Sequence, residues 1–585
     1  MTFLWLILTV IILSLFNFGK SLGFSLFGDD WLALYRYHIF FNNFLSYFQL
    51  SNYMGNYDAT HILMGLIYRV FDYNSFPYFL ISLILRIIAV ISFYPVFFSI
   101  TRNRFIASIP SILFSSAYGG IETTNWVFNM TTYISISLLN IYLWRYISTL
   151  KRITLLDTFL QAVLIFLSFY FTPTRMHALI FIVPFLELLR LSQRSPKNIL
   201  LILSRTAIFI LPMILFRFAT GSQWDKGYLS MLPDLQTRGF NILFYIVTNV
   251  GSIFFPDKIF GIFIKNLSQP NISELGIFLS KAFTIFLPYT IIIYLLSFSF
   301  KQKLKFFSLS LVGIIIFSIF FWLSLQTNNI NNFGNLITFL ETLIGGYTLL
   351  VFSFYFYLSR KTYIVLSSVG LISLLFTLAF LIAPWLAFSG DFPSDHRYLT
   401  VPAAAFIIAI STFCTILWKQ HRQITTNLSV IIIIFLLVVN SLSLQLYFEN
   451  FLSHGRKADY VEKLFKQLVS QVNPPKNDKP LVFLFLTDDQ FNLYNAIGFG
   501  FDTHLMLIHP YLSKNLKALP KPIIVDNEQS LLSILKDPNS SELKRYGHPP
   551  AQIPLENVYS FYLVEDQLIS NTDRLRKDIP YLLAK

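Results

Sequence analysis

Charged residues and cysteines are both scarce in this chain of 585 residues. Only 13% of the residues are charged, whereas soluble domains carry about 25%, so an ordinary soluble protein is excluded. The single cysteine, Cys414, excludes a disulfide framework and a metal site with several cysteine ligands. Internal repeats of roughly 20 to 50 residues are also missing, which argues against a solenoid.

Apolar residues are abundant instead, at 55% of the chain. Apolar runs long enough to cross a bilayer as a helix recur up to residue 449. We expect about thirteen membrane spans, at 3–23, 76–99, 105–120, 127–144, 154–172, 177–189, 199–218, 276–299, 306–326, 336–358, 362–388, 398–418 and 427–447. A weaker stretch at 239–264, interrupted by Pro256, Asp257 and Lys258, is predicted to lie at the membrane interface.

The distribution of charge predicts an orientation. Residues 450–585 hold 16 basic and 15 acidic residues, so the net charge of +14 arises almost wholly from residues 1–449, with 28 basic and 15 acidic residues. Fifteen of those basic residues, and no acidic one, lie in six alternate connections, at 102–104, 145–152, 190–197, 301–305, 360–361 and 419–422. Short cytoplasmic loops retain Lys and Arg. The sequence therefore predicts a multi-pass plasma-membrane protein with a cytoplasmic N-terminus and an extracytoplasmic C-terminal tail. It gives no reason to expect a nucleic-acid partner.

The tail reads as a small α/β domain over 450–585, following an all-α polytopic domain over 1–449. Strands are expected at 481–486, 505–508, 523–525 and 558–564, with helices near 456–472, 490–497, 528–536 and 571–577. Asp488 and Asp489 follow the first of these strands, a position where many α/β proteins bind ligands. No glycine-rich loop accompanies them, which favours a solvated turn that caps the next helix.

Three carboxylates are expected at the outer membrane face. Asp29 and Asp30 stand in FGDDWLALYRYHIFF, directly after the first apolar run, and Glu122 stands in FSSAYGGIETTNWVFNMTTY, in the next outer loop. Adjacent carboxylates against apolar surface repel each other, so at least one needs a cation, a hydrogen-bond donor or a proton. The alternatives are ordinary interfacial charges for the Asp pair and a helix N-terminal charge for Glu122.

A third polar segment precedes the twelfth span. The sequence SGDFPSDHRYLTVPAAAF places His396, Arg397 and Tyr398 at the outer end of that helix. An arginine there suits bidentate binding of phosphate, and the tyrosine can add a hydrogen bond. Alternatively, Arg397 snorkels, or it pairs with Asp391 or Asp395.

Three other charged residues stand in or near apolar runs. Arg175 lies between the fifth and sixth spans; it either supplies further positive charge to a phosphate or has a structural role. Arg86 and Glu341 fall within spans, where a buried charge is a functional candidate, although the sequence names a partner for neither.

These motifs, in this order and on one side of the membrane, resemble the C-type glycosyltransferase (GT-C) superfamily. The features that match are the acidic pair after the first span, an amphipathic first outer loop at about 24–75, Glu122 four residues before Trp126, and Arg-Tyr-Leu entering a late helix. Similar members are polytopic enzymes that use polyprenyl-phosphate sugars, including protein O-mannosyltransferases and lipid A aminoarabinose transferases. The resemblance covers about 1–190 and, more weakly, 385–447. The WWDYG signature of oligosaccharyltransferase catalytic subunits is absent, so peptide N-glycosylation is not supported.

The resemblance implies a role for each candidate residue. Asp29 or Asp30 corresponds to the catalytic acid of the first loop, which acts as general base on the acceptor, and Glu122 to a second-loop acid that assists or helps hold a cation. Arg397 corresponds to the residue that binds the lipid-linked phosphate, and His396, Tyr398 and Arg175 are further candidates for that contact. Asp29, Asp30 and Glu122 together would suit Mg²⁺ or Mn²⁺, but the sequence does not decide metal dependence.

We therefore expect a membrane glycosyltransferase that moves a sugar from a polyprenyl-phosphate donor to an extracytoplasmic glycan, lipid or protein. Attack by the acceptor needs a base, and phosphate departure needs positive charge. Attack from the opposite face with one base predicts inversion at the sugar carbon.

Other functions stay open at this point. A secondary transporter or lipid flippase tends to place polar groups at the midplane on broken helices, often with an internal repeat, whereas the acids here gather at one face. A surface-polysaccharide polymerase or ligase with lipid-diphosphate donors would depend on outer Arg and His and tolerate the loss of all three acids. A non-enzymatic receptor or scaffold is the remaining alternative. The sugar, the acceptor and the role of the tail are not evident from the sequence.

Overall fold

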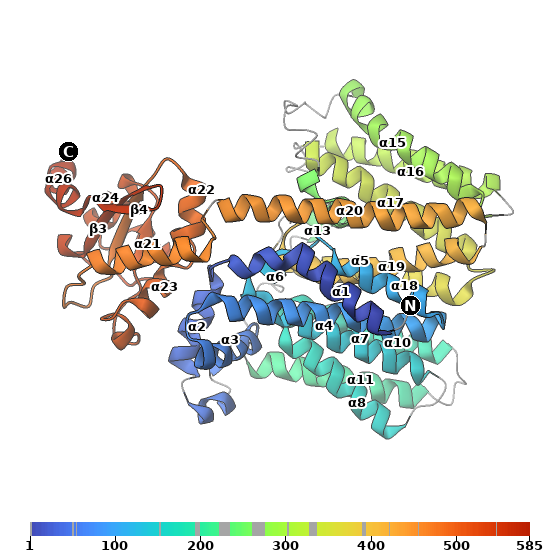
Figure 1. Cartoon of the computed structure of the whole chain (residues 1–585), viewed down its shortest axis with the longest axis horizontal. Helices are drawn as coiled ribbons and strands as arrows, with labels where there is room; N and C mark the ends of the chain where they lie inside the picture. The colour runs from blue at the N-terminus through green and yellow to red at the C-terminus, as the bar shows by residue number, and fades with distance from the viewer. Residues whose placement is uncertain are drawn as a thin grey trace.

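The computed structural model describes residues 3–584 apart from 42, 50–51, 54, 151–153, 193–198, 221–234, 260–274, 301–302, 327–335, 389–392, 421, 454 and 546. It comprises a bundle of long helices and a smaller C-terminal domain beyond one end of that bundle (Figure 1). The N-terminus lies toward the far end of the bundle, and helix α20 (Gln423–Ser453) leads from the bundle to the C-terminal domain.

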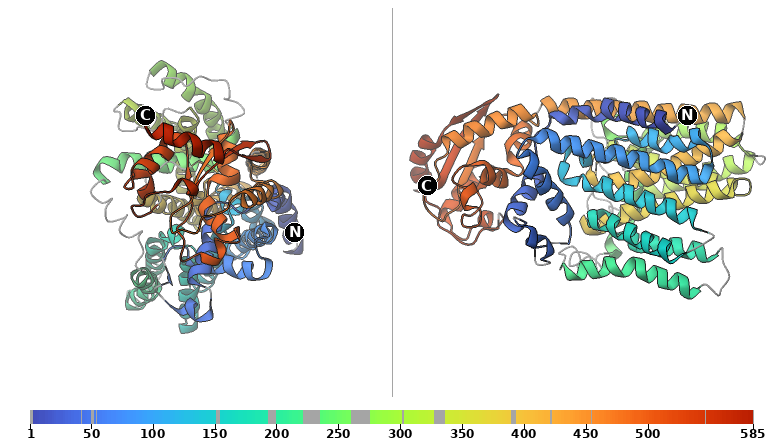
Figure 2. Two further views of the ribbon diagram at one scale, coloured as in Figure 1. Left: turned by 90° about the vertical axis from the view of Figure 1, so that its left-hand side faces the viewer. Right: turned by 60° about the horizontal axis from the view of Figure 1, so that its bottom comes forward.

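Within the described ranges, nine helical segments are long and apolar enough to cross a membrane. They run largely side by side (Figure 2) and comprise α1 (Phe3–Phe18), α4 (Ser75–Thr101), α11 (Ile199–Ala219), α15 (Leu275–Ser297), α16 (Lys303–Gln326), α17 (Leu336–Ser359), α18 (Ile364–Phe388), α19 (Thr400–Lys419) and α20. The chain is thus an integral membrane protein, as predicted. The other expected spans form α5 (Arg104–Ser115), α7 (Thr131–Ser148), α8 (Leu155–Phe171) and α10 (Leu179–Ser192). Because several of these are short, the total of thirteen crossings stays a prediction.

The stretch expected at the membrane interface forms helix α13 (Leu235–Phe254), which packs against α17. Two glycines allow the close approach: a Cβ on Gly251 would lie 1.9 Å from the Glu341 carbonyl oxygen, and one on Gly345 would lie 1.8 Å from the Val247 carbonyl oxygen. Residues 244–250 are buried. The packing therefore differs from that of an interfacial helix, because small residues let the two backbones meet. It also places Glu341 at this helix contact.

Short elements at one end of the bundle form a layer between it and the C-terminal domain (Figure 1). The first loop contributes α2 (Asp29–Phe40), η2 (Phe44–Phe48) and α3 (Asp58–Phe71). The second contributes α6 (Glu122–Asn125) and η4 (Val127–Asn129). Two later connections add α9 (Pro173–Met176) and η7 (Arg397–Leu399). The residues predicted for catalysis and phosphate binding lie in or directly beside these elements, whereas Arg86 lies in α4 and Glu341 in α17.

The C-terminal domain contains a four-stranded sheet in the order β2-β1-β3-β4. The central strand β1 (Val482–Leu486) pairs in parallel with β2 (Ile523–Val525) and β3 (Val558–Val564), and β4 (Gln567–Ser570) returns antiparallel to β3. Around the sheet lie α21 (Ala458–Gln471), α22 (Gln490–Leu493), η8 (Tyr494–Gly498), α23 (Phe501–Ile508), η9 (Ser513–Asn515), α24 (Glu528–Lys536), α25 (Ser541–Arg545), η10 (Leu555–Asn557) and α26 (Thr572–Ala584). A small α/β fold and three of the four predicted strands are confirmed.

The predicted strand at 505–508 is wrong, because these residues form the end of α23. Gly500 begins that helix with a φ of +81°, and Asp502 occupies its first turn. Phe501 and Leu505, four residues apart, are both buried, a helical spacing that a short apolar run conceals. Asp489 caps α22, as the sequence indicated: its Oδ1 accepts from the Asn492 N–H at 2.9 Å.

Candidate functional site

The two adjacent carboxylates of the first loop have different environments. Asp30 is fully buried, and its two oxygens accept from the backbone N–H groups of Phe27, at 2.8 Å, and Phe128, at 2.7 Å. Burial raises the pKa of Asp30 to about 7, although the two hydrogen bonds and Arg456 act in the opposite direction. Asp30 therefore ties the first loop to the second, and both its oxygens are engaged.

Asp29 begins α2, one position before Asp30 and about 100° away around the helix axis. It is partly exposed. Burial against its surroundings raises the pKa of Asp29; the positive charge of Arg397 lowers it, and the negative charge of Asp502 raises it further. Asp29 is therefore the carboxylate of the pair that lies within electrostatic reach of Arg397 and is not bound to the backbone of the second loop.

The second loop and the segment before α19 are joined along their backbones. The N–H of Gly120 donates to the Ser394 carbonyl at 3.0 Å, and the N–H of Glu122 donates to the Asp395 carbonyl at 3.0 Å. Gly120 has a φ of +78°, and a Cβ there would lie 2.3 Å from Thr400 Oγ1. The second glycine of the Gly-Gly sequence, Gly120, is thus explained by a close contact that only glycine permits.

This contact places Glu122 beside Arg397. Glu122 Oε2 accepts from the backbone N–H of Arg397 at 3.2 Å and lies 3.5 Å from Arg397 Nη1. The guanidinium lies 4.4 Å from the centre of the Trp126 ring, a cation–π distance. Both charged side chains keep about a quarter of their surface exposed, 23% for Arg397 and 26% for Glu122. Arg397 is thus oriented by two second-loop residues while retaining access to a ligand.

Arg175, Tyr398 and His396 are the other residues predicted to contact phosphate, and each of them makes contacts within the protein. Arg175 is only 2% exposed and donates to Thr123 and Asn129 of the second loop and to Thr132 at the start of α7. Its guanidinium lies 5.3 Å from the ring centre of Tyr398. Arg175 is accordingly a structural cross-link in this conformation.

Tyr398 and His396 are also engaged within the protein. The Tyr398 hydroxyl lies 3.2 Å from that of Tyr57 in the first loop. His396 Nδ1 accepts from the Tyr398 N–H at 3.3 Å, and the two rings stack. Burial and the neighbouring arginines lower the pKa of His396 to about 2, so it is neutral, and positive charge for a phosphate comes from Arg397.

The pairing of Lys258 near this centre was not predicted from the sequence. Lys258 lies 3.8 Å from Asp395 and 3.9 Å from Asp257. Asp395, which the sequence offered as a partner for Arg397, therefore pairs elsewhere, and burial raises its pKa to about 7. Asp391 lies outside the described residues. A pairing of this kind joins segments far apart in the chain, which a linear pattern does not reveal.

Arg456, directly after α20, is a second unpredicted member. It is 3% exposed, donates to the Asn125 carbonyl at 2.8 Å, and lies 4.4 Å from the centre of the Phe27 ring. Its charge lowers the pKa of Asp30. Arg456 thus links the C-terminal junction to both outer loops.

The C-terminal domain covers the Asp29 loop. The Gly28 N–H donates to the Phe499 carbonyl at 3.2 Å, and a Cβ on Gly500 would lie 2.6 Å from the Gly28 carbonyl oxygen. The Phe499 ring packs against Trp126 at 5.5 Å between ring centres. Domain and site therefore share a wall, and Asp502 acts on Asp29 from the domain side.

Arg86, the buried charge of α4, also has a structural role. It donates to the Tyr133 hydroxyl at 2.7 Å and the Ala117 carbonyl at 3.0 Å, and it bonds Thr124 at 3.2 Å. It therefore anchors the second loop that carries Glu122.

Asp29, Asp30 and Glu122 fit poorly as a set of metal ligands. Both oxygens of Asp30 accept backbone N–H groups, and Glu122 is engaged by Arg397. Across the described part of the chain, no group of three or more His, Cys, Asp and Glu side chains is arranged to hold a metal ion. We derive no step through a metal.

No family model and no curated protein matches the chain. Among solved structures, it is similar to the archaeal oligosaccharyltransferase AglB from Archaeoglobus fulgidus, in complex with an inhibitory peptide and a dolichol-phosphate. The identity is 12% and the TM-score 0.39, over 95% of this chain and 69% of that one. It is also similar to ArnT from Cupriavidus metallidurans bound to undecaprenyl phosphate, at 13% identity and a TM-score of 0.33, over 85% of this chain and 86% of that one.

At these TM-scores the folds overlap only in part. The function of this chain therefore rests on its own residues.

Proposed function

We propose that this protein is an integral-membrane glycosyltransferase that takes its sugar from a polyprenyl-phosphate donor. The observation that carries the proposal is the grouping of Asp29, Glu122 and Arg397. These residues come from three connections far apart in sequence, and they lie in one layer where membrane helices end. The group offers a carboxylate and a guanidinium with separate tasks.

Asp29 would act as the general base. A partly buried carboxylate with a raised pKa holds a proton more readily than an exposed one. The acceptor oxygen forms the new bond to the anomeric carbon as its proton passes to Asp29. The bond from that carbon to the phosphate oxygen breaks, and its electron pair leaves with the phosphate. With one base and direct displacement, the sugar carbon inverts.

Arg397 would bind the departing phosphate. Its guanidinium stays charged and suits two phosphate oxygens at once. Glu122 and Trp126 fix its orientation through the contacts at 3.5 Å and 4.4 Å, so the positive charge is preorganised where negative charge develops. Glu122 is then a positioning residue.

The membrane setting supports a lipid-linked donor. A sugar attached to a polyprenyl phosphate cannot leave the bilayer, and the candidate group lies at the ends of apolar helices. We place this face outside the cell, because the basic connections lie on the opposite side. The acceptor would then be an extracytoplasmic glycan, lipid or protein.

The test uses the full-length protein in membrane vesicles supplied with a panel of radiolabelled polyprenyl-phosphate hexoses and pentoses. Release of free polyprenyl phosphate and transfer of label to membrane components are both measured. We expect Asp29→Asn to abolish transfer and Arg397→Gln to reduce it severely, while both variants remain folded in the membrane.

Matched substitutions at exposed positions, Asp478→Asn and Arg574→Gln, should leave transfer unchanged, since both side chains lie in the C-terminal domain and are mostly solvent-accessible. The assignment of Asp29 as the base would be overturned if Asp29→Asn kept full transfer from every donor that the unmodified protein uses. Uptake of a solute or lipid across the vesicle membrane, without sugar transfer, would overturn the proposed function in favour of a transporter.

A further inference from the structure

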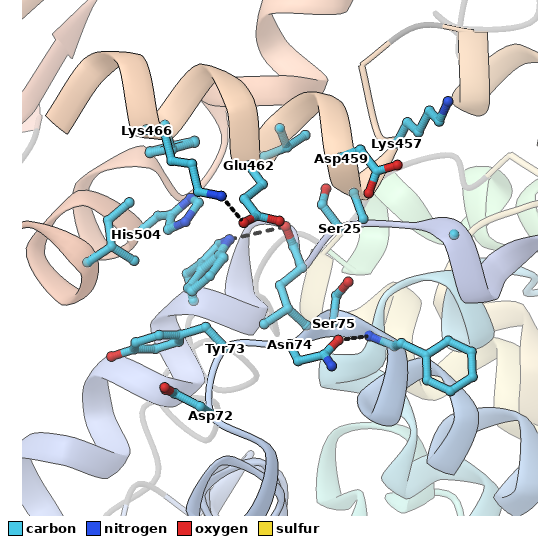
Figure 3. Close-up of a pocket in the computed structure, with 18 of the residues that line it drawn as sticks. Ser25, Asp72, Tyr73, Asn74, Ser75, Lys457, Asp459, Glu462, Lys466 and His504 are labelled. Carbon is cyan, nitrogen blue, oxygen red and sulfur yellow. Dashed lines mark hydrogen bonds and ion pairs between the residues drawn. The ribbon is translucent and has the colours of Figure 1, made fainter. Parts of the chain in front are cut away.

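A cavity of about 1060 Å³ lies between the C-terminal domain and the membrane part (Figure 3). One wall is the helix α21; the opposite wall is formed by the end of the first span and the turn that joins α3 to α4. Neither Asp29, Glu122 nor Arg397 lines it. Trp31, on the α2 turn beside Asp29, lines it instead, so α2 separates the two sites.

Three candidate membrane spans end in this lining. Lys20 and Leu22 close the segment Phe3–Gly23, Ser75 opens Ser75–Thr101, and Leu452 ends Gln423–Leu452. Helices leave the hydrocarbon at such points, so the cavity lies at the level of the lipid headgroups. Any ligand there has the adjoining membrane leaflet as its nearest source.

The wall on α21 carries charges of both signs. Lys457, Asp459, Glu462 and Lys466 border the cavity within about two and a half helical turns. Glu462 and Lys466 pair at 2.5 Å, whereas Lys457 and Asp459 have no ion-pair partner in the described part of the chain. Lys20 and Asp72 add one charge of each sign from the membrane side. Three basic and three acidic side chains leave the lining close to neutral but strongly dipolar.

The aromatic floor does not provide an open stacking surface. One face of Trp31 stacks on His504, with ring centres 3.5 Å apart, and Tyr73 lies 5.8 Å away as a second ring neighbour. The indole N–H is also engaged, because it donates to the Leu26 carbonyl at 3.1 Å. Saccharide sites often stack the sugar on a free aromatic face, so this floor favours a smaller, charged headgroup.

The edge of the cavity between the end of α3 and the start of α4 is apolar and exposed. Phe71 is 43% exposed and Phe76 48%, and both line the cavity where α3 meets the start of α4. Exposed phenylalanines at the end of a membrane span offer a surface for acyl chains. The cavity thus combines charged side chains of both signs on the α21 wall with an apolar edge where α3 meets α4. A phospholipid has the matching combination of a charged headgroup and acyl chains.

We propose that this cavity binds one membrane phospholipid with a zwitterionic headgroup, its phosphate toward Lys20 and Lys457 and its ammonium toward Asp459 and Glu462. Because α21 supplies one wall and membrane helices the other, the bound lipid also holds the C-terminal domain against the membrane part. The proposal is independent of the glycosyltransferase assignment.

The test is lipid binding to the delipidated full-length protein in detergent, followed by native mass spectrometry. The probes are palmitoyl-oleoyl phosphatidylethanolamine, the matching phosphatidylglycerol, and free phosphoethanolamine. We expect one tightly bound phosphatidylethanolamine and no binding of the free headgroup at the same concentration. Lys457→Ala and Glu462→Gln should each weaken binding about fivefold, the usual worth of one partly exposed charge contact.

Filling the cavity provides the steric arm of the test. Ala458→Trp and Ser470→Trp place a large ring into the lining from α21, and each should reduce binding at least about tenfold. Ser470 is exposed, so its variant tests the site even if Ala458→Trp fails to fold. Lys463→Ala is the control, because Lys463 lies on the same helix and pairs with Asp566 away from the cavity.

Three results would overturn the proposal. The first is unchanged phosphatidylethanolamine binding in both tryptophan variants. The second is preferential binding of phosphatidylglycerol that Glu462→Gln strengthens, which would indicate an anionic lipid. The third is displacement of the lipid by maltotriose, which would indicate a saccharide site.

Discussion

Glu122 Oε2 contacts Arg397 twice, accepting from its backbone N–H at 3.2 Å and facing its guanidinium at 3.5 Å. One carboxylate oxygen thus holds both the backbone at the start of the span Arg397–Lys419 and the guanidinium of Arg397.

Weakening the pair should reduce catalysis without removing charge from the phosphate site. Arg397→Lys keeps one positive charge but loses the planar fork, and we expect kcat/KM for donor to fall about 10- to 100-fold. Glu122→Gln retains an acceptor for the Arg397 N–H and loses the ion pair, so a smaller fall is expected. Arg574→Lys, at an exposed surface, serves as the control. Equal activity of Arg397→Lys and the unmodified protein would contradict the role of the fork.

The rate of transfer should depend on pH through Asp29. Because burial raises the pKa of Asp29, this carboxylate takes up its proton at a higher pH than an exposed aspartate does. Activity should therefore fall as the pH decreases through the pKa of Asp29. Asp502 raises this pKa and Arg397 lowers it. Asp502→Asn should therefore move the acidic limb of the pH–rate profile downward, and Arg397→Gln should move the limb of any residual activity upward. Shifts in the same direction would contradict Asp29 as the titrating base.

Asp30 should control stability instead. Its pKa is about 7 in the folded protein, against 3.8 for an ordinary aspartate, so the folded state binds the proton more tightly. The stabilising contribution is complete below pH 3.8 and is lost as pH rises toward about 7. Thermal unfolding in detergent should show this slope, and Asp30→Asn should remove it.

A second substitution separates the hydrogen bonds of Asp30 from its charge. Asp30→Ala leaves the Phe27 and Phe128 N–H groups without their acceptor and should cost about 1–3 kcal/mol of unfolding free energy. Asp29→Ala, at the neighbouring position, should cost less. The reverse order would contradict the structural role of Asp30.

The contact between the C-terminal domain and the Asp29 loop can be tested at Gly500. An alanine there would place its Cβ 2.6 Å from the Gly28 carbonyl oxygen at a φ of +81°, and we expect both lower stability and reduced transfer. Gly547→Ala is a matched control, since Gly547 has a φ of +73° and open space around it. The control shares the backbone strain, about 1–3 kcal/mol, but leaves the loop contact intact. Similar losses of transfer in both variants would contradict a role for this contact.

The single buried cysteine makes the orientation testable. In a Cys414→Ala background, Lys514→Cys in the C-terminal domain should react with a membrane-impermeant maleimide applied to intact cells. Lys361→Cys should react only after permeabilisation. Lys361 lies two residues before Tyr363, whose hydroxyl donates to the Lys419 carbonyl at 3.2 Å, and the distribution of basic residues predicts that this end of the bundle is cytoplasmic. Labelling of Lys361→Cys in intact cells would reverse the proposed orientation.

The membrane architecture follows from local properties of the chain. Apolar runs of bilayer length and basic connections are read within about twenty residues, so they predict the helices and an orientation without knowledge of packing. The strands near Val482, Ile523 and Val558 were predictable for the same reason. The segment 505–508 was not, because an apolar run of four residues has no period of its own, and burial of one helical face decided its structure.

The sequence by itself also determined which polar residues are candidates for the site, since few acids and arginines interrupt its apolar runs. Only the tertiary structure decided their roles. Asp29 and Asp30 are neighbours in the chain, yet one is tied to two backbone N–H groups and the other lies within reach of Arg397. Arg175 is enclosed by second-loop hydroxyls, while Arg397 stays accessible. The physical reason is that the ionisation and reach of a charged group depend on desolvation and on partners brought from distant loops.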